Sequence, residues 1–244
     1  MTLYFIGLGL GNEKDITLNG IEAVKKCSKI YLEHYTSALN CSIPDLEGLY
    51  GKKIIVANRE LVEQHGDAIV DEARNADVAF LVVGDPFCAT THQDLRLRAI
   101  ERGVKVKVIH NASIVSAIGE IGLDVYKFGR ITTIPFDNRN VKSPVEVFLQ
   151  NHKNGLHTLF LLDLEPLHNK FMKISDAVSY LIRNGVGKDV LAVGIAGLGS
   201  ENCQIKSGKL EDLKQAKFTA IPQSLVIPGK MHFMEEGSLK QQGL

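Results

Sequence analysis

The stretch "LYFIGLGLGNEKDIT" (residues 3–17) decides the fold. Four apolar residues run into glycines at every second position, Gly7, Gly9 and Gly11, and a polar segment follows. A short apolar run that ends in glycines predicts a buried strand, and the periodicity beyond it predicts a helix over residues 17–27. A buried strand, a tight turn and a helix are the repeating unit of α/β folds, so this opening predicts that class.

The rest of the first half repeats the same alternation. Further strands are predicted at 29–33, 53–57, 78–84 and 104–110, with helices at 62–75 and 92–102 between them. Continuous apolar strands separated by helices are typical of a mostly parallel sheet with both faces covered. We therefore expect an N-terminal α/β domain built on such a sheet.

The second half has a different spacing. Strands are predicted at 129–136, 156–164, 189–198, 202–208 and 223–229, and helices at 143–153 and 174–183. From residue 189 onward the strands follow one another with short links, which favours antiparallel pairing and a mixed sheet. The change of spacing predicts a boundary near residue 112, with domains at 1–112 and 113–244. The polar end "EEGSLKQQGL" is expected to fray.

Composition limits the classes of function. The 244 residues carry 28 basic and 28 acidic side chains, and this balance disfavours a protein that binds nucleic acid through bulk positive charge. No apolar run is long enough for a membrane span, and "MTLYFIG" lacks the features of a signal peptide. Four scattered cysteines suit a reducing cytosol, and eight histidines in no ligand spacing argue against a metal site.

The glycine turn admits two interpretations. A dinucleotide fingerprint requires G-x-G-x-x-G, and here the third glycine comes one residue early, although Glu33 ends the next strand where a ribose-binding acid would lie. That interpretation predicts an NAD(P)-linked oxidoreductase. The other is a turn that lets a chain segment or a ligand approach the backbone closely.

Two later loops also follow predicted strands. In "VVGDPFCATTHQDL" (82–95), Gly84 and Pro86 fix Asp85 at the carboxyl end of a strand, where open α/β sheets bind ligands. Asp85 is equally well placed as a plain turn residue, and Thr90 or Thr91 is predicted to cap the next helix. In "VIHNASIVSAIGEIGL" (108–123), Ser113 is predicted to cap a helix.

A third segment, "GLHTLFLLDLEP" (155–166), is strongly apolar before it ends in acids. Such a strand is an ordinary core element, and it is also suited to form an apolar wall for an adenine ring.

Taken together, these segments resemble a known family. "LYFIGLGL", "VGDPFCATTH", "VIHNASIVSAIG", "GLHTLFLLDL" and "VIPGKMHF", in this order over nearly the whole chain, are similar to the diphthine synthases, which belong to the corrin/porphyrin-type methyltransferases. The resemblance implies a two-domain tetrapyrrole-methylase-like fold, S-adenosylmethionine in the cleft between the domains, and a homodimer in the cytoplasm.

The resemblance also implies a substrate. It is translation elongation factor 2, at a histidine that bears a 3-amino-3-carboxypropyl group, whose amino group is methylated repeatedly during diphthamide biosynthesis. S-adenosylhomocysteine is the by-product. Archaeal members make the trimethylated product diphthine and eukaryotic members add a methyl ester. This chain is short, as the archaeal members are, which favours trimethylation.

Carried over by motif, the family's cofactor contacts fall on eight positions. They are Leu10, Asp85, Cys88, Ser113, Ile114, Leu162, Leu198 and Gln223. The chain departs from the family pattern at two places: Gly197 stands where members often carry Arg, and Gln223 stands where they often carry His. No residue is assigned as a general base, and no metal or nucleic acid is expected.

The chemistry places few demands on the protein. Methyl transfer from a sulfonium to a neutral amine is an in-line displacement, so the protein needs to bind, align and exclude water. Asp85 is expected to orient the cofactor by attraction to its cationic groups. Three other functions stay open: a tetrapyrrole methyltransferase of the same fold, the NAD(P)-linked oxidoreductase, and a nucleotide-binding regulator without enzymatic activity.

Overall fold

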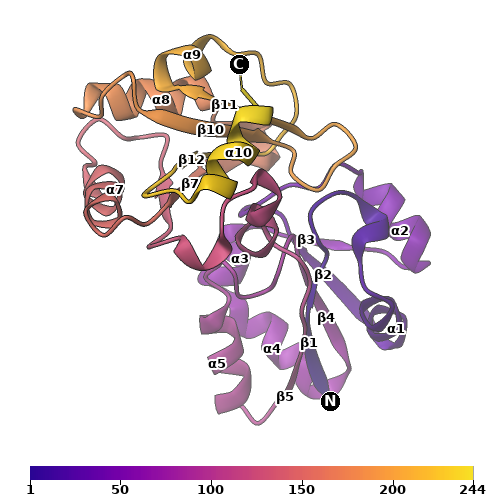
Figure 1. Cartoon of the computed structure of the whole chain (residues 1–244). Coiled ribbons are helices and arrows are strands. Elements are labelled where there is room, and N and C mark those ends of the chain that lie inside the picture. The colour runs from indigo at the N-terminus through magenta and orange to yellow at the C-terminus, as the bar shows by residue number, and fades with distance from the viewer. Residues whose placement is uncertain (244) are drawn as a thin grey trace. The chain divides into compact units, whose positions relative to one another are not determined.

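The structure is a computed structural model that describes residues 1–243 of the 244. The chain forms two compact units, Met1–Val115 and Ser116–Leu244 (Figure 1). Each unit has its own sheet and its own core. They are described in turn.

The first unit contains a five-stranded sheet in which every pairing is parallel. The strands are β1 (Thr2–Gly7), β2 (Lys29–Glu33), β3 (Ile55–Ala57), β4 (Val78–Val82) and β5 (Lys105–Ile109), in the order β3-β2-β4-β1-β5. All five were predicted from the apolar runs, and the parallel α/β class is confirmed.

Helices cover both faces of this sheet (Figure 1). They are α1 (Leu18–Lys26) and α2 (Ile43–Tyr50) on one face, and α3 (Arg59–Glu63), α4 (Gly66–Asn75) and α5 (Gln93–Glu101) on the other. Because side chains alternate along a strand, Leu3 and Phe5 of β1 join the core under α4 and α5, while Tyr4 and Ile6 pack toward α1 and α2. A short helix, α6 (Ile114–Ala117), follows β5.

Two helices of the first unit differ from the prediction. The helix expected over 62–75 is divided into α3 and α4 at His65. Helix α2 was not predicted, although its sequence signals are present: Ser42 and Asp45 form a capping box, and Gly51 ends the helix in the left-handed conformation. The helix predicted over residues 17–27 is α1, which begins at Leu18 after its cap Thr17.

The second unit contains a mixed five-stranded sheet. Its strands are β6 (Thr132–Ile134), β7 (Thr158–Leu162), β10 (Leu191–Ala196), β11 (Gln204–Lys209) and β12 (Gln223–Ile227), in the order β11-β10-β12-β7-β6. Only the β6–β7 pair is parallel, so the predicted mixed sheet is confirmed. A small hairpin of β8 (Leu164–Glu165) and β9 (Lys170–Phe171) follows β7.

The second unit has four α-helices within the described residues. They are α7 (Ser143–Lys153), α8 (Ile174–Arg183), α9 (Leu210–Gln215) and α10 (Phe233–Gln241). The single-turn helices η2 (Ile118–Ile121), η3 (Val125–Lys127) and η4 (Pro166–His168) lie in its loops. The expectation that the polar C-terminus frays is wrong for residues 235–241, because His232 and Glu235 form a capping box that starts α10. Leu244 lies outside the described residues.

None of the helices in residues 1–243 combines the length and the apolar character that crossing a membrane requires.

Candidate functional site

Three loops meet at the carboxyl edge of the first unit's sheet. They follow β1, β4 and β5, and β1 has β4 on one side and β5 on the other. From β1 the chain passes β4 to reach β2, whereas from β4 it passes β1, in the opposite direction, to reach β5. In open α/β sheets, ligands bind at the carboxyl ends of strands where the chain turns in opposite directions.

The glycine turn after β1 pairs with the loop after β4. Gly9 N–H donates to Gly84 O at 3.3 Å, and Gly84 N–H donates to Gly9 O at 2.8 Å. Both residues have positive φ angles, 81° and 79°, which glycine adopts without strain. A Cβ on Gly7 would lie only 2.6 Å from Gly84 O and 2.8 Å from Asn111 Cβ. It is therefore the protein's own chain that approaches the glycine turn so closely.

Asp85 joins the loops after β4 and β5. Its Oδ1 accepts a hydrogen bond from Phe87 N–H at 3.0 Å, and its Oδ2 lies 2.7 Å from His110 Nδ1 and 3.3 Å from Asn111 N. Burial, with 6% of the residue exposed, raises the pKa of Asp85, but these hydrogen bonds outweigh it and hold the pKa below its ordinary value. The structure thus places an ionised carboxylate at the edge of the sheet.

Asn111 completes the connection between the three loops. Its side-chain N–H group donates to Gly7 O at 3.0 Å and to Asp15 O at 2.9 Å, and its Oδ1 accepts from Ala112 N–H. Asp15 in turn accepts from Gly11 N–H at 2.6 Å. The sequence interpretation did not assign these roles to Asn111 and Asp15, because each depends on contacts across about a hundred residues that no local pattern shows.

Five of the predicted cofactor contacts lie in the first unit. Leu10 is in the glycine turn, Asp85 and Cys88 are in the loop after β4, and Ser113 and Ile114 follow β5. Leu10, Cys88 and Ile114 are half-buried, whereas Ser113 is buried. These positions come together because β1, β4 and β5 are adjacent parallel strands whose carboxyl ends share one edge.

The caps predicted for α5 are wrong. The residue that precedes the helix is His92, and it makes no side-chain capping bond. The hydroxyl of Thr90 donates instead to Pro86 O at 2.6 Å, and that of Thr91 donates to Glu63 Oε1 at 3.1 Å. The hydroxyls of both threonines therefore bond within the loop or to Glu63 and do not cap the helix.

The other three predicted contacts lie at one edge of the second unit's sheet. Leu162 ends β7, Gln223 begins the neighbouring β12, and Leu198 follows β10, whose Ala196 is paired with Gln223. Leu162 and Leu198 are buried. The Gln223 side chain accepts from Ile174 N–H at 2.9 Å and donates to Ala220 O at 3.2 Å, so its amide links β12 to the start of α8.

Comparisons with known proteins agree over the whole chain. The sequence profile of the family described as "Tetrapyrrole (Corrin/Porphyrin) Methylases" matches residues 2–214. The chain belongs to this family. A "Probable diphthine methyl ester synthase" of Arabidopsis thaliana is 44% identical over 98% of this chain and 97% of its own length. A "Diphthine synthase" of Methanosarcina mazei is also 44% identical, over 97% of this chain and 94% of its own length.

Solved structures agree with the sequence relatives. A "Crystal structure of diphthine synthase" has a TM-score of 0.94 and 38% identity, and covers 100% of this chain and 96% of that one. The tetrapyrrole methylase fold and the resemblance to diphthine synthases are thereby confirmed. This member of the tetrapyrrole methylase family is an enzyme, a methyltransferase that depends on S-adenosylmethionine.

The geometry of this family member contradicts the dinucleotide interpretation of the glycine turn. The N–H groups of Leu8, Gly9 and Gly11 already donate to Val82 O, Gly84 O and Asp15 Oδ2, so they offer nothing to a phosphate. The expected ribose-binding acid, Glu33, is fully buried and accepts from Tyr35 N–H and from Thr36. It is not accessible to a ribose hydroxyl.

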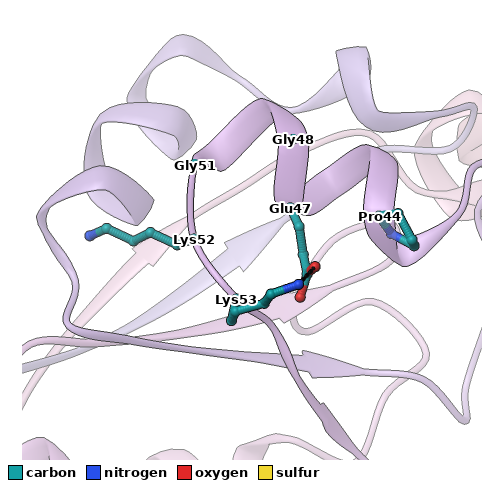
Figure 2. Close-up of a pocket in the computed structure, with 6 residues that line it drawn as sticks. All are labelled: Pro44, Glu47, Gly48, Gly51, Lys52 and Lys53. Carbon is teal, nitrogen blue, oxygen red and sulfur yellow. Dashed lines mark hydrogen bonds and ion pairs between the residues drawn. The ribbon is translucent and has the colours of Figure 1, made fainter.

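A surface hollow elsewhere in the first unit is not part of this edge (Figure 2). It has a volume of about 360 Å³ and is lined by Pro44, Glu47, Gly48, Gly51, Lys52 and Lys53. Lys53 pairs with Glu47 at 2.7 Å, and Lys52 Nζ donates to backbone carbonyls at the end of α1, including Lys25 O. The hollow lies before β3, at the amino edge of the parallel sheet. Its two lysines are therefore already paired, with Glu47 and with the backbone at the end of α1.

Over residues 1–243, no group of three or more His, Cys, Asp or Glu side chains is arranged to hold a metal ion.

Proposed function

We propose that this methyltransferase acts on translation elongation factor 2, at a histidine that bears a 3-amino-3-carboxypropyl group. It methylates the amino group repeatedly, to the trimethylammonium stage, and so makes diphthine for diphthamide biosynthesis. The observation that carries the proposal is that several diphthine synthases and diphthine methyl ester synthases are 41–44% identical to this protein over 93–98% of its chain.

The first unit's site fits the proposed cofactor by its chemistry. S-adenosylmethionine carries a sulfonium and an ammonium group, and the ionised Asp85 carboxylate supplies a complementary charge at the edge of the sheet. Leu10, Cys88 and Ile114, which follow β1, β4 and β5 at the same edge, are half-buried and add apolar atoms. When bound, the cofactor supplies an activated methyl group, and S-adenosylhomocysteine is released.

The residues present would then act by binding and alignment. Asp85 holds its loop through Phe87 and the loop after β5 through His110 and Asn111, so the carboxylate is already oriented before a ligand arrives. Such preorganisation is the main contribution that a protein makes to a displacement in which the cofactor carries the reactive carbon. Leu162, Leu198 and Gln223 stay predicted contacts. We further propose a cytoplasmic homodimer.

The direct test is mass spectrometry of elongation factor 2 that carries the unmethylated precursor, after incubation with the enzyme and S-adenosylmethionine. The proposal expects three added methyl groups at the modified histidine. A fourth methyl that is released by mild base would identify an ester and correct the number of transfers. Label transfer to a porphyrinogen, with none to elongation factor 2, would favour the tetrapyrrole substrate instead.

A second test addresses the site. Asp85→Ala is expected to weaken S-adenosylmethionine binding by about tenfold or more, because a charge-assisted contact and the orientation of two loops are lost together. Asp77→Ala is the matched control: this carboxylate accepts from Thr2 N–H at 2.8 Å near the opposite edge of the same sheet. Calorimetric titration should separate the two, and equal dissociation constants would remove Asp85 from the site.

A further inference from the structure

We propose that Glu33 and His92 form a buried positioning pair that fixes the loop of residues 84–92 for cofactor binding. The inference rests on the proposed use of this loop, which carries Asp85 and Cys88. It assigns a role in the reaction to two residues that lie outside the predicted contacts.

The pair lies deep in the first unit. Glu33 ends β2, His92 precedes α5, and both are 0% exposed. His92 Nε2 lies 3.8 Å from Glu33 Oε2, which is an ion-pair distance but too long for a hydrogen bond. Within residues 1–243, neither ring nitrogen of His92 has a hydrogen-bond partner. The ring packs edge-on against Phe80, with centroids 5.1 Å apart, and against Tyr35 at 6.1 Å.

Glu33 anchors the segment that follows β2. One carboxylate oxygen accepts from Tyr35 N–H at 2.7 Å and Thr36 N–H at 2.6 Å, and the other accepts from the Thr36 hydroxyl at 2.7 Å. Burial raises the pKa of Glu33, but His92 and these hydrogen bonds outweigh it and lower the pKa overall. The second oxygen also faces His92, so the pair joins the segment after β2 to the end of the 84–92 loop.

Packing alone gives no reason for this arrangement. The space between Phe80 and Tyr35 would suit an apolar ring, whereas a buried histidine without hydrogen bonds carries an uncompensated desolvation penalty. A polar group kept in such a position calls for an explanation beyond stability. The explanation we infer lies in the loop that His92 ends.

That loop is strained and held at both ends. Ala89 has a φ of 58°, a left-handed conformation that alanine rarely adopts. At the near end, Asp85 bonds to Phe87, His110 and Asn111. At the far end, Thr91 bonds to Glu63 and His92 faces Glu33. Strain persists only where the surroundings impose it, so the two anchors hold Cys88 and Ala89 away from the relaxed conformation.

Neither member of the pair needs to touch the cofactor in this scheme. His92 and Glu33 act on Cys88 and Ala89 through the backbone of the loop, so they are positioning residues. The pair should then govern cofactor affinity and KM for S-adenosylmethionine, while kcat at saturating cofactor changes little.

The experiment is a double-mutant cycle with Glu33→Gln and His92→Phe, read by calorimetric titration with S-adenosylmethionine at 25 °C. His92→Phe keeps a ring between Phe80 and Tyr35 but removes both nitrogens. Each single variant is expected to weaken binding about tenfold, and the double variant no more than either single, because both break one interaction. His92→Gln, which keeps a side-chain N–H group, should recover part of the affinity.

Tyr31→Phe is the matched control. It lies on the same strand as Glu33, and the substitution removes a hydrogen bond of 2.7 Å to Glu72 on α4, not a bond to the loop. We expect its melting temperature to fall and its affinity for the cofactor to stay unchanged. If the pair only stabilises the fold, the Glu33 and His92 variants will behave in the same way as this control, and the inference is overturned.

The outcomes separate the inference from the proposed function. A wild-type protein that does not bind S-adenosylmethionine contradicts the proposed cofactor site itself. A wild-type protein that binds it, with variants of equal affinity and lower melting temperatures, contradicts only the positioning pair. If circular dichroism shows that His92→Phe does not fold, Glu33→Gln and His92→Gln carry the same comparison.

Discussion

Each unit of this protein buries one histidine beside one glutamate, and the two pairs are bonded in opposite ways. In the second unit, His157 Nε2 lies 2.9 Å from Glu235 Oε1, and His157 Nδ1 accepts from Gly229 N–H at 2.9 Å. Both ring nitrogens are used. In the first unit, His92 Nε2 and Glu33 Oε2 are 3.8 Å apart, and neither ring nitrogen has a hydrogen-bond partner in the described part of the chain.

The second unit's pair is the centre of a complete network. Glu235 also accepts from Asp124 N–H at 3.0 Å, from His232 N–H at 2.7 Å and from Lys127 Nζ. These bonds connect η3, the residue that precedes β7 and the start of α10 to one carboxylate. A buried polar group whose hydrogen bonds are all made stabilises one conformation, whereas a buried polar group without them costs stability. The difference separates a structural pair from a positioning pair.

The largest expected effect is on the complete network. Glu235→Ala should lower the free energy of unfolding of the second unit by about 3–5 kcal/mol, because Lys127, His157 and two backbone N–H groups lose their common acceptor inside the protein. Denaturant unfolding followed by circular dichroism measures this loss.

Glu165, whose side chain is 43% exposed against 3% for Glu235, provides the control. It accepts from Lys170 at 2.8 Å and from His168 at 3.2 Å, so its partners are of the same types. Glu165→Ala should change the stability little, because water replaces the lost partners. A similar loss in both variants would show that burial does not distinguish them.

Acid should weaken the same network in two steps. Burial lowers the pKa of His157 below 6.5. As the pH falls, His157 therefore takes up its proton at a higher pH in the unfolded state than in the folded state, and the free energy of unfolding decreases below pH 6.5. Burial raises the pKa of Glu235, but its hydrogen bonds outweigh this and lower the pKa from 4.5 to about 2. The contribution of ionised Glu235 to the free energy of unfolding is therefore full above pH 4.5 and is lost as the pH falls toward 2.

The Glu235 step corresponds to about 3 kcal/mol between pH 4.5 and pH 2. Urea midpoints measured from pH 7 to pH 3 should trace the His157 step and the upper part of the Glu235 step. Glu235→Gln should flatten the profile below pH 4.5. A variant profile parallel to that of the wild type would assign the acid sensitivity to other carboxylates.

A substitution in the glycine turn should lower the stability less than Glu235→Ala does, but it should also weaken cofactor binding. Gly7→Ala places a Cβ at 2.6 Å from Gly84 O, so β1 and the loop after β4 must move apart, with a loss of about 1–3 kcal/mol. S-adenosylmethionine binding should weaken with it. Gly48→Ala is the control, because its Cβ would meet nothing within 4 Å on helix α2. Normal cofactor binding by Gly7→Ala would show that the spacing of these loops is unimportant.

Much of the fold follows from local patterns in the sequence. The apolar runs at β1, β4 and β7 are continuous because both faces of these strands are covered, and that signal does not depend on distant residues. Helix α10 was missed because its start depends on Glu235, and the importance of this carboxylate comes from Lys127 and His157, about 80 to 110 residues away in the chain.

The site was predictable only in part. Gly84 and Pro86 around Asp85 are a local signal, and the structure places that carboxylate at the sheet edge as expected. His110, Asn111 and His92 gave no such signal, because a histidine or asparagine near a strand end is common in loops. Their roles arise only when β1, β2, β4 and β5 lie side by side, which is a property of the sheet order.

The smallest expected effect tests the strain in the 84–92 loop. Ala89→Gly removes the penalty of a φ of 58°, but glycine also gains freedom in the unfolded chain, so the net stabilisation should be at most about 1 kcal/mol. Asn169→Gly is the control at a φ of 51°, and it should gain less because asparagine tolerates this conformation. If the strain serves positioning, Ala89→Gly will melt at the same or a higher temperature yet bind S-adenosylmethionine more weakly, since the relaxed loop samples more conformations. Unchanged affinity with raised stability would mean that the strain at Ala89 has no part in binding, and would leave the anchoring by His92 and Glu33 without its proposed purpose.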